Sequence, residues 1–315
     1  MDPRESPSEE ILTAARNLRA HTVAIEVVSA FTTAGVKSIL LKGPSFARWL
    51  YDSPHERPYI DIDLLIAPDR VEAAERVLRS HGFDPDPLEI PHDMPWHAHT
   101  WTRASDGAMI DLHRFIVGTE VSSETGWTIL SAQIEPINVA GRTLIGLDRE
   151  ARLVHVALHA AQHGSRLVRP GRDLDRALER EQSETWARAR DLADRLHAIP
   201  AFARGLRLSE AGAKLATRLE LPTSAPLDVA ARAADASYEG VALAWWLSRS
   251  RGVGRLRFVG RKLFPPASFM RAWSPLAGRS NAGLVIAYLW RVAWVVGRIP
   301  RAVIDVARVR LRRGK

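Results

Sequence analysis

The sequence contains no cysteine among its 315 residues. This absence excludes disulfide bonds, thiolate metal ligands and cysteine nucleophiles, so any chemistry has to use oxygen and nitrogen groups. A chain without cysteine suits a reducing compartment. Residues 1–5 are polar and acidic, which is not the pattern of a secretory signal. We therefore expect a cytoplasmic protein.

Acidic residues are scarce in one part of the chain. Residues 249–315 contain 16 lysines and arginines but a single acid, Asp305, which gives a net charge of +15. The rest of the chain has 28 basic and 35 acidic side chains, a net charge of −7. An acidic body with a basic tail indicates that the body holds the chemistry and that the tail contacts an anionic partner.

Long uninterrupted hydrophobic runs are also missing. The run from 284 to 296 is broken by Arg291 and is shorter than a membrane span requires. It carries Trp290 and Trp294, one helical turn apart, and is followed by basic residues. Three interpretations of residues 249–315 remain open: a helix at an anionic membrane surface, peripheral to its inner face; a buried helix with a solvated basic end; or a segment that binds RNA phosphates.

Local patterns predict mixed structure first and helices later. We expect helices over 8–34, 46–51 and 68–81, and strands over 36–41, 60–66, 97–103 and 108–117, the last two joined as a hairpin by Asp106-Gly107. Later helices are expected over 149–163, 184–196, 209–219 and 227–248. The predicted fold class is therefore α+β, with a mixed β-sheet flanked by helices over 1–147, a helical domain over 148–248, and a basic, tryptophan-containing extension over 249–315.

Three aspartates stand in apolar strand-like runs. Asp61 and Asp63 alternate with apolar residues, so on a strand they point to the same face. Neighbouring buried carboxylates are costly unless a cation lies between them. Asp111 is the third, within Met109–His113. The three side chains could converge on two Mg²⁺ ions, with Asp61 and Asp63 as ligands and Asp111 as a ligand of the second ion or as general base.

The turn that follows the first strand predicts a phosphate site. Gly43 lets the backbone approach a phosphate, Ser45 offers a hydroxyl and N–H groups near a helix start, and Lys42 can neutralise phosphate charge. Arg57 can pair with a phosphate or with Asp61. These four residues are the predicted contacts of a nucleoside triphosphate.

The string LKGPSFARWLYDSPHERPYIDIDLLI, followed by MIDLH, resembles the DNA-polymerase-β-type nucleotidyltransferase superfamily. Within it, the order Lys-Gly, Arg, Asp-Ile-Asp, Asp-Leu-His is similar to a poorly characterised bacterial nucleotidyltransferase family, and HVALHAAQHGSRL with RDLDRAL is similar to its helical part. The resemblance implies a small mixed sheet, Mg²⁺ and a nucleoside triphosphate. It implies metal roles for Asp61, Asp63 and Asp111, and phosphate binding by Gly43 and Ser45.

The expected reaction is transfer of a nucleoside monophosphate to an acceptor that the sequence does not identify. A glycan, lipid-linked or other envelope intermediate would suit the basic tail, and so would tRNA or protein, as in toxin-type relatives. A non-catalytic scaffold that keeps the fold and meets a membrane or RNA is the other class of function. His155, His159 and His163 share one helix face. We favour packing and local hydrogen bonds over metal binding for them.

Overall fold

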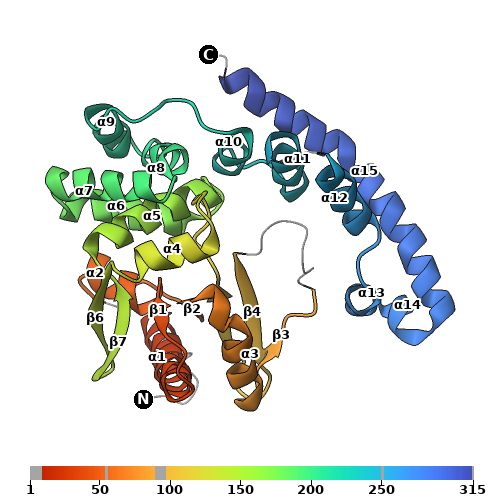
Figure 1. Cartoon of the computed structure of the whole chain (residues 1–315), viewed down its shortest axis with the longest axis horizontal. Coiled ribbons are helices and arrows are strands. Elements are labelled where there is room, and N and C mark those ends of the chain that lie inside the picture. The colour runs from red at the N-terminus through yellow and green to blue at the C-terminus, as the bar shows by residue number, and fades with distance from the viewer. Residues whose placement is uncertain (1–8, 54–55, 89–96, 250–251, 314–315) are drawn as a thin grey trace. The chain divides into compact units, whose positions relative to one another are not determined.

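The computed structural model describes residues 9–53, 56–88, 97–249 and 252–313. These residues fall into two compact units, and the elements of both are labelled in Figure 1. Among the described residues, the first unit comprises those up to 85 together with 97–156 and 172–198, and the second comprises 86–88, 157–171 and 199–313. The domain boundaries expected after residues 147 and 248 stay predictions.

The first unit is built on one mixed sheet of seven strands in the order β3-β4-β5-β2-β1-β7-β6. The strands are β1 (Ser38–Leu40), β2 (Asp61–Ile66), β3 (Asp84–Pro85), β4 (Ala98–Arg103), β5 (Ala108–His113), β6 (Ile134–Val139) and β7 (Arg142–Leu147). β2 is parallel to β5 and β1 is parallel to β7, whereas the other neighbours are antiparallel. The predicted α+β class with a mixed sheet is confirmed.

Helices α1 and α3 bury one face of this sheet. Val27 and Phe31 of α1 and Leu78 of α3 pack against Ile62 and Ile110 of the central strands in one apolar cluster. Among the described residues, the helices that begin before residue 199 include α1 (Glu9–Thr33), α2 (Pro44–Leu50), the 3₁₀ turn η2 (Pro68–Arg70), α3 (Val71–Ser80), α4 (Ser123–Leu130), α5 (Arg149–His163), α6 (Val168–Arg180) and α7 (Ser183–Arg195). Residue 8, where the first helix was expected to begin, lies outside the described residues.

The β6–β7 hairpin was not predicted from the sequence. Its turn residues, Ala140 and Gly141, both have positive φ, of 48° and 81°. A two-residue hairpin turn needs this conformation, for which asparagine, aspartate or glycine is the usual signal. Because the first turn residue is alanine, the sequence lacks the usual signal for such a turn. In the structure, the side chain of Asn138 accepts a hydrogen bond from the Gly141 N–H at 3.1 Å.

The second unit is helical. It holds α8 (Ile199–Leu206), α9 (Glu210–Arg218), α10 (Leu227–Ala233), α11 (Tyr238–Arg249), α12 (Val253–Leu263), α13 (Ala267–Trp273), α14 (Pro275–Arg279) and α15 (Asn281–Arg313). The expectation of one continuous helix over 227–248 is wrong. The chain turns at Asp235, which has a positive φ of 57° and whose carboxylate accepts hydrogen bonds from Arg166 N–H and the Ser165 hydroxyl.

Helix α15 is much longer than the apolar run from 284 to 296. It has 33 residues and includes Pro300. By length and composition alone, residues Asn281–Leu311 could cross a membrane. The described part of the chain contains no other helix that meets this test.

Candidate functional site

Side chains of β2 and β5 alternate between the hydrophobic core and the opposite face of the sheet. Ile62, Leu64 and Ile110 belong to the core that α1 and α3 cover. Because successive side chains of a strand point to opposite faces, Asp63 and Asp111 face away from that core. The alternation that buries the aliphatic residues therefore also gathers the carboxylates on one face.

Asp63 and Asp111 are register partners across the parallel strands β2 and β5. Asp63 is buried, with 2% of its surface exposed, and Asp111 is half-buried. Thr100, opposite Asp111 on β4, donates a hydrogen bond from Oγ1 to Asp111 Oδ1 at 2.8 Å. The structure thus brings together two of the three predicted aspartates and orients one of them through Thr100.

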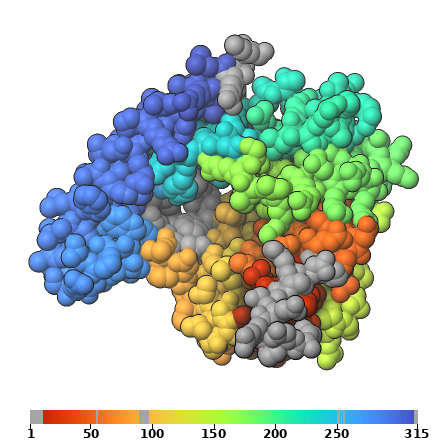
Figure 2. Space-filling model, turned by 180° about the vertical axis from the view of Figure 1, so that it is seen from behind, coloured from red at the N-terminus to blue at the C-terminus, as the bar shows by residue number. Residues whose placement is uncertain are grey.

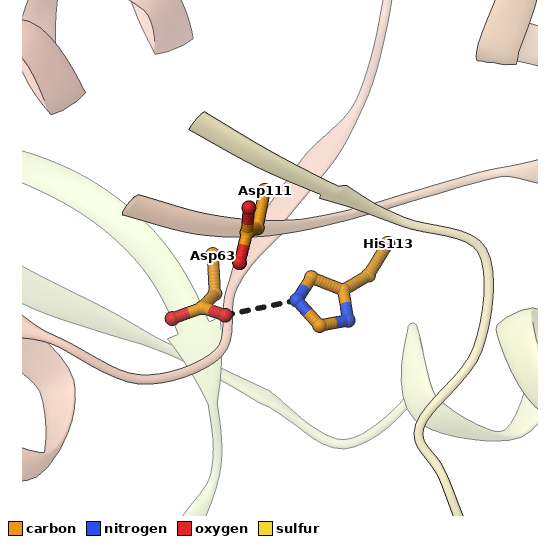
Figure 3. Close-up of side chains that lie close together, drawn as sticks. All are labelled: Asp63, Asp111 and His113. Carbon is orange, nitrogen blue, oxygen red and sulfur yellow. Dashed lines mark hydrogen bonds and ion pairs between the residues drawn. The ribbon is translucent and has the colours of Figure 1, made fainter. Parts of the chain in front are cut away.

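An ammonium group and an imidazole both contact the carboxylate of Asp63. Lys42 Nζ lies 2.7 Å and His113 Nε2 lies 2.9 Å from Asp63 Oδ1 (Figure 3 shows the bond to His113). Burial acts to raise the pKa of Asp63, but the charge of Lys42 and the hydrogen bond from His113 outweigh it and hold this pKa well below its ordinary value. Asp63 is therefore a carboxylate at neutral pH.

Negative charge at the site exceeds what Lys42 neutralises. Burial, followed by the charge of Asp63, raises the pKa of both Asp61 and Asp111. Burial acts to lower the pKa of Lys42, but the charge of Asp63 raises it, so Lys42 stays an ammonium. One ammonium thus faces three carboxylates, and a further cation would stabilise all three in their ionised form.

Asp63, Asp111 and His113 form a candidate metal centre. Each offers a ligand atom, and these atoms lie within 4.8 Å of one another (Figure 3). Carboxylate oxygens are the donors that Mg²⁺ prefers, whereas imidazole also suits zinc and similar ions. We expected Asp61 rather than His113 beside the other two aspartates. In the part of the chain that the structure describes, the compact group does not include Asp61.

The turn after β1 places Lys42 beside the aspartates. The Leu41 N–H donates to the Asp63 carbonyl at 3.0 Å, which fixes where the turn begins. Gly43 has φ of +57° and ψ of −114°, a conformation that L-residues rarely adopt. Ser45 is fully buried, and its Oγ has no hydrogen-bond partner among the described residues. Phosphate contacts by Gly43 and Ser45 stay predictions.

Arg57 is anchored inside the first unit. Its Nε and Nη2 donate to both oxygens of Asp173 at 2.8–3.1 Å, and Tyr51 donates its hydroxyl to the same carboxylate at 2.7 Å. The guanidinium carbon lies 5.5 Å from the centroid of the Phe46 ring. The sequence left a phosphate or Asp61 as partners of Arg57, and in the structure the partner is Asp173. A nucleotide contact of Arg57 stays a prediction.

The three histidines of α5 do not form a metal group within the described residues. His155 is buried against the edge of Phe46, with ring centroids 5.4 Å apart. Burial and the nearby charge of Lys42 lower the pKa of His155 to about 3, so the imidazole is neutral. His159 and His163, in the second unit, contact each other at 4.7 Å between ring centroids.

Two residues at or near the site were not assigned a role by the sequence. His113 follows Asp111 by two positions, so strand alternation alone places it on the same face. The structure bonds it to Asp63. The partnership of Asp173 with Arg57 spans 116 positions and had no local signal.

Comparison with known proteins adds a family to this geometry. A sequence profile described as "Uncharacterised nucleotidyltransferase" matches residues 7–212. No curated protein matches the chain. Among solved structures, one similar chain is an antigenic nucleotidyltransferase-like protein from Paracoccidioides brasiliensis, with 18% identity and a TM-score of 0.35 over 57% of this chain and 92% of that one.

Proposed function

Because this chain belongs to the family of uncharacterised nucleotidyltransferases, we propose that it transfers a nucleoside monophosphate from a nucleoside triphosphate to an acceptor hydroxyl or phosphate, with Mg²⁺ as cofactor. The observation that carries the proposal is the register pairing of Asp63 with Asp111 on the sheet face opposite the core. Adjacent, partly or fully buried carboxylates with too little positive charge around them are suited to bind a divalent cation, which in turn can bind the phosphates of a nucleotide.

The metal ligands in this proposal are Asp61, Asp63 and Asp111, with two Mg²⁺ ions expected. His113 holds Asp63 in place through its Nε2 and, as an imidazole, is a poorer ligand for Mg²⁺ than a carboxylate. Bound Mg²⁺ would offset charge on the triphosphate and lower the pKa of the attacking hydroxyl. The fit rests on the donor set, in which Asp63 and Asp111 lie close together and Lys42 is the ammonium beside Asp63. Burial and, after it, the charge of Asp63 raise the pKa of Asp61 and Asp111, so a bound cation would favour their ionised form.

The other side chains supply charge and a proton acceptor. Lys42, partly open to solvent, provides positive charge for phosphate oxygens next to Asp63. Thr100 fixes one oxygen of Asp111, and the Asp111 carboxylate accepts the proton of the acceptor hydroxyl. The acceptor oxygen forms a bond to the α-phosphorus, the bond from that phosphorus to the bridging oxygen breaks, and pyrophosphate leaves.

Thermal denaturation with a panel of nucleoside triphosphates tests the binding half of this proposal. With Mg²⁺, at least one triphosphate should raise the melting temperature of the wild type, and Asp111→Asn should remove the increase. Asp69→Asn is the matched control, because Asp69 is an exposed carboxylate on η2 whose ion pair is with Arg70 and not with a residue of the site. A wild type that no triphosphate stabilises, with or without Mg²⁺, would reject the proposal.

Transfer itself is tested by incubating the protein with triphosphates that are radiolabelled at the α-phosphate and with cell extract. We expect label on a macromolecule or glycan in the wild-type reaction and none with Asp63→Asn. Nuclease, protease and organic extraction of the labelled product then identify the acceptor class. If binding is confirmed but no label moves, the protein is a nucleotide-binding scaffold instead.

A further inference from the structure

Helix α15 presents a continuous apolar stripe to solvent. Its exposed positions recur every three or four residues, which places them on one side of the helix. The large apolar side chains on this stripe are Val285, Ile286, Leu289, Trp290, Val296, Ile299, Val303 and Ile304. Leu289 is 69% exposed, and the stripe runs from Val285 to Ile304; exposed Arg310, one heptad after Val303, separates it from Leu311. A stripe of this length is far larger than the scattered apolar residues of an ordinary protein surface.

The opposite side of α15 is packed against its own unit. Ala287 belongs to a cluster with Phe269 and Met270 of α13, and Val306 belongs to one with residues of α10 and α11. Figure 1 shows α15 passing α11, α12, α13 and α14, all of which it contacts. The stripe is thus the outer face of a helix that is fixed in the fold.

Two polar residues lock this orientation. Arg291, which interrupts the apolar run, is buried and donates from Nε to the Lys262 carbonyl at 2.9 Å, with its guanidinium over the Phe269 ring. Asp305 accepts hydrogen bonds from the N–H and hydroxyl of Ser237, where α11 begins. A helix that crossed a bilayer would have to give up these contacts and carry Arg291 and Asp305 into hydrocarbon.

The exposed charged side chains on the C-terminal half of α15 are basic. Arg301, Arg308 and Arg310 are exposed on the C-terminal half of α15, and the only acid of residues 249–315, Asp305, is engaged by Ser237. Leu256 on α12 and Phe264 at its C-terminal end are exposed apolar residues as well, and α12 contacts α15. Figure 2 shows the surface of these helices in blue.

We propose that α15 docks flat on a lipid bilayer that carries anionic headgroups, with the stripe inserted at the boundary between headgroups and acyl chains. An apolar face flanked by arginines, on a helix too firmly packed to insert upright, is the pattern of an interfacial helix. Arginines near an anionic surface are attracted to it over a distance of about one Debye length. RNA would match the arginines but leave the aliphatic stripe in water, and a second copy of this chain would bring two strongly basic surfaces together. This inference does not depend on nucleotidyl transfer.

Deleting residues 283–315 is a poor test, because it would also remove the packing partner of α10, α11, α13 and α14. Substitutions on the exposed stripe are better. We choose the triple variant Leu289→Gln/Val296→Gln/Val303→Gln. The matched control is Ile145→Gln/Leu167→Gln/Val168→Gln, which changes three exposed apolar residues that do not belong to α15.

Co-sedimentation with vesicles provides the readout. The full chain should bind vesicles of phosphatidylcholine with about 30% phosphatidylglycerol and bind pure phosphatidylcholine much more weakly. The stripe variant should lose more than about tenfold in partitioning, whereas the control variant should bind like the wild type. About 0.5 M NaCl should weaken the wild type by screening the arginines. Unchanged binding of the stripe variant would overturn the proposal.

The absence of cysteine makes a second measurement possible. Leu289→Cys and Ile145→Cys each give one attachment site for an environment-sensitive fluorophore. Anionic vesicles should shift the emission of the label at 289 to the blue and leave the label at 145 unchanged. Three results would overturn the proposal: no shift at 289; a shift at 289 without vesicles that grows with protein concentration, which means self-association; and resistance of the bound protein to alkaline extraction, which means a spanning helix.

Discussion

Asp63 and Asp111 occupy the same register position on two parallel neighbouring strands, yet their pKa values are moved in opposite directions. Both are desolvated, which raises the pKa of each carboxyl. The difference is that Lys42 and His113 contact Asp63, whereas Asp111 accepts a hydrogen bond from the hydroxyl of Thr100. The sheet therefore places one compensated and one under-compensated carboxylate next to each other.

This asymmetry predicts opposite stability effects for two matched substitutions. In the presence of EDTA, Asp63→Asn should destabilise the fold by about 3 kcal/mol or more, because it leaves the largely buried Lys42 without its counter-charge. Asp111→Asn should leave stability unchanged or raise it, since it removes repulsion and the amide oxygen can still accept from Thr100. Urea denaturation measures both. Destabilisation of equal size in the two variants would contradict the charge balance described above.

The buried His155 predicts a loss of stability in mild acid. The pKa of this imidazole is about 3 in the folded protein, against 6.5 for an ordinary histidine. Between these values the unfolded chain binds a proton that the folded chain does not, so stability falls as pH falls below 6.5, by about 1.4 kcal/mol per pH unit from this residue. Above pH 6.5, His155 does not make the stability depend on pH.

Urea denaturation between pH 4.5 and 7.5 checks this slope. His155→Gln should be less stable at neutral pH because of imperfect packing beside Phe46, and its stability should depend less on pH. His81→Gln is the control, since His81 is only half-buried and lies at the C-terminal end of α3. An identical pH slope in wild type and His155→Gln would refute the assignment.

Much of this site is readable from the sequence, and the reason is local. Asp61, Asp63 and Asp111 stand in apolar strands, where alternation decides which face each side chain takes, so the sheet face can be predicted without knowing its neighbours. The same alternation places His113, two positions after Asp111, on the same face of the sheet. The strand order is less local, but the family pattern of short motifs in a fixed order is enough to predict a mixed sheet.

What the sequence could not give depends on distant or unusual contacts. Arg57 finds Asp173 across 116 positions, and no rule of spacing connects them. The chain turns at Asp235 and so interrupts an otherwise good helical pattern. The carboxylate of Asp235 is bound there by Ser165 and Arg166, which lie in the connection between α5 and α6. The outward stripe of α15 also depends on tertiary packing, since sequence alone did not decide between a buried and an interfacial helix.

Arg57 could serve only to anchor the fold through Asp173 or could also contact a phosphate, and substitutions distinguish these two roles. Asp173→Asn or Arg57→Leu should cost about 3–5 kcal/mol, because either leaves a buried charge without its partner. Arg57→Lys keeps the charge but loses the bidentate contact with Asp173, so this variant should fold with reduced stability. If Arg57 only anchors the fold, the Mg²⁺-triphosphate affinity of folded Arg57→Lys equals that of the wild type. An affinity that drops at least tenfold would instead assign Arg57 a phosphate contact.

Gly43 tests whether the turn after β1 matters beyond folding. A Cβ at this position would meet Tyr59 Cδ2 at 3.5 Å, an ordinary contact, so the penalty of Gly43→Ala comes from its backbone angles and should be about 1–3 kcal/mol. Gly35, at the end of α1, also has a positive φ, of 69°, and open space around it, which makes Gly35→Ala the matched control. Both variants should lose stability. Only Gly43→Ala should also weaken Mg²⁺-triphosphate binding, because relaxing its backbone moves Lys42 relative to Asp63. Equal triphosphate affinity in the two variants, measured by titration calorimetry on folded protein, would remove this turn from the binding site.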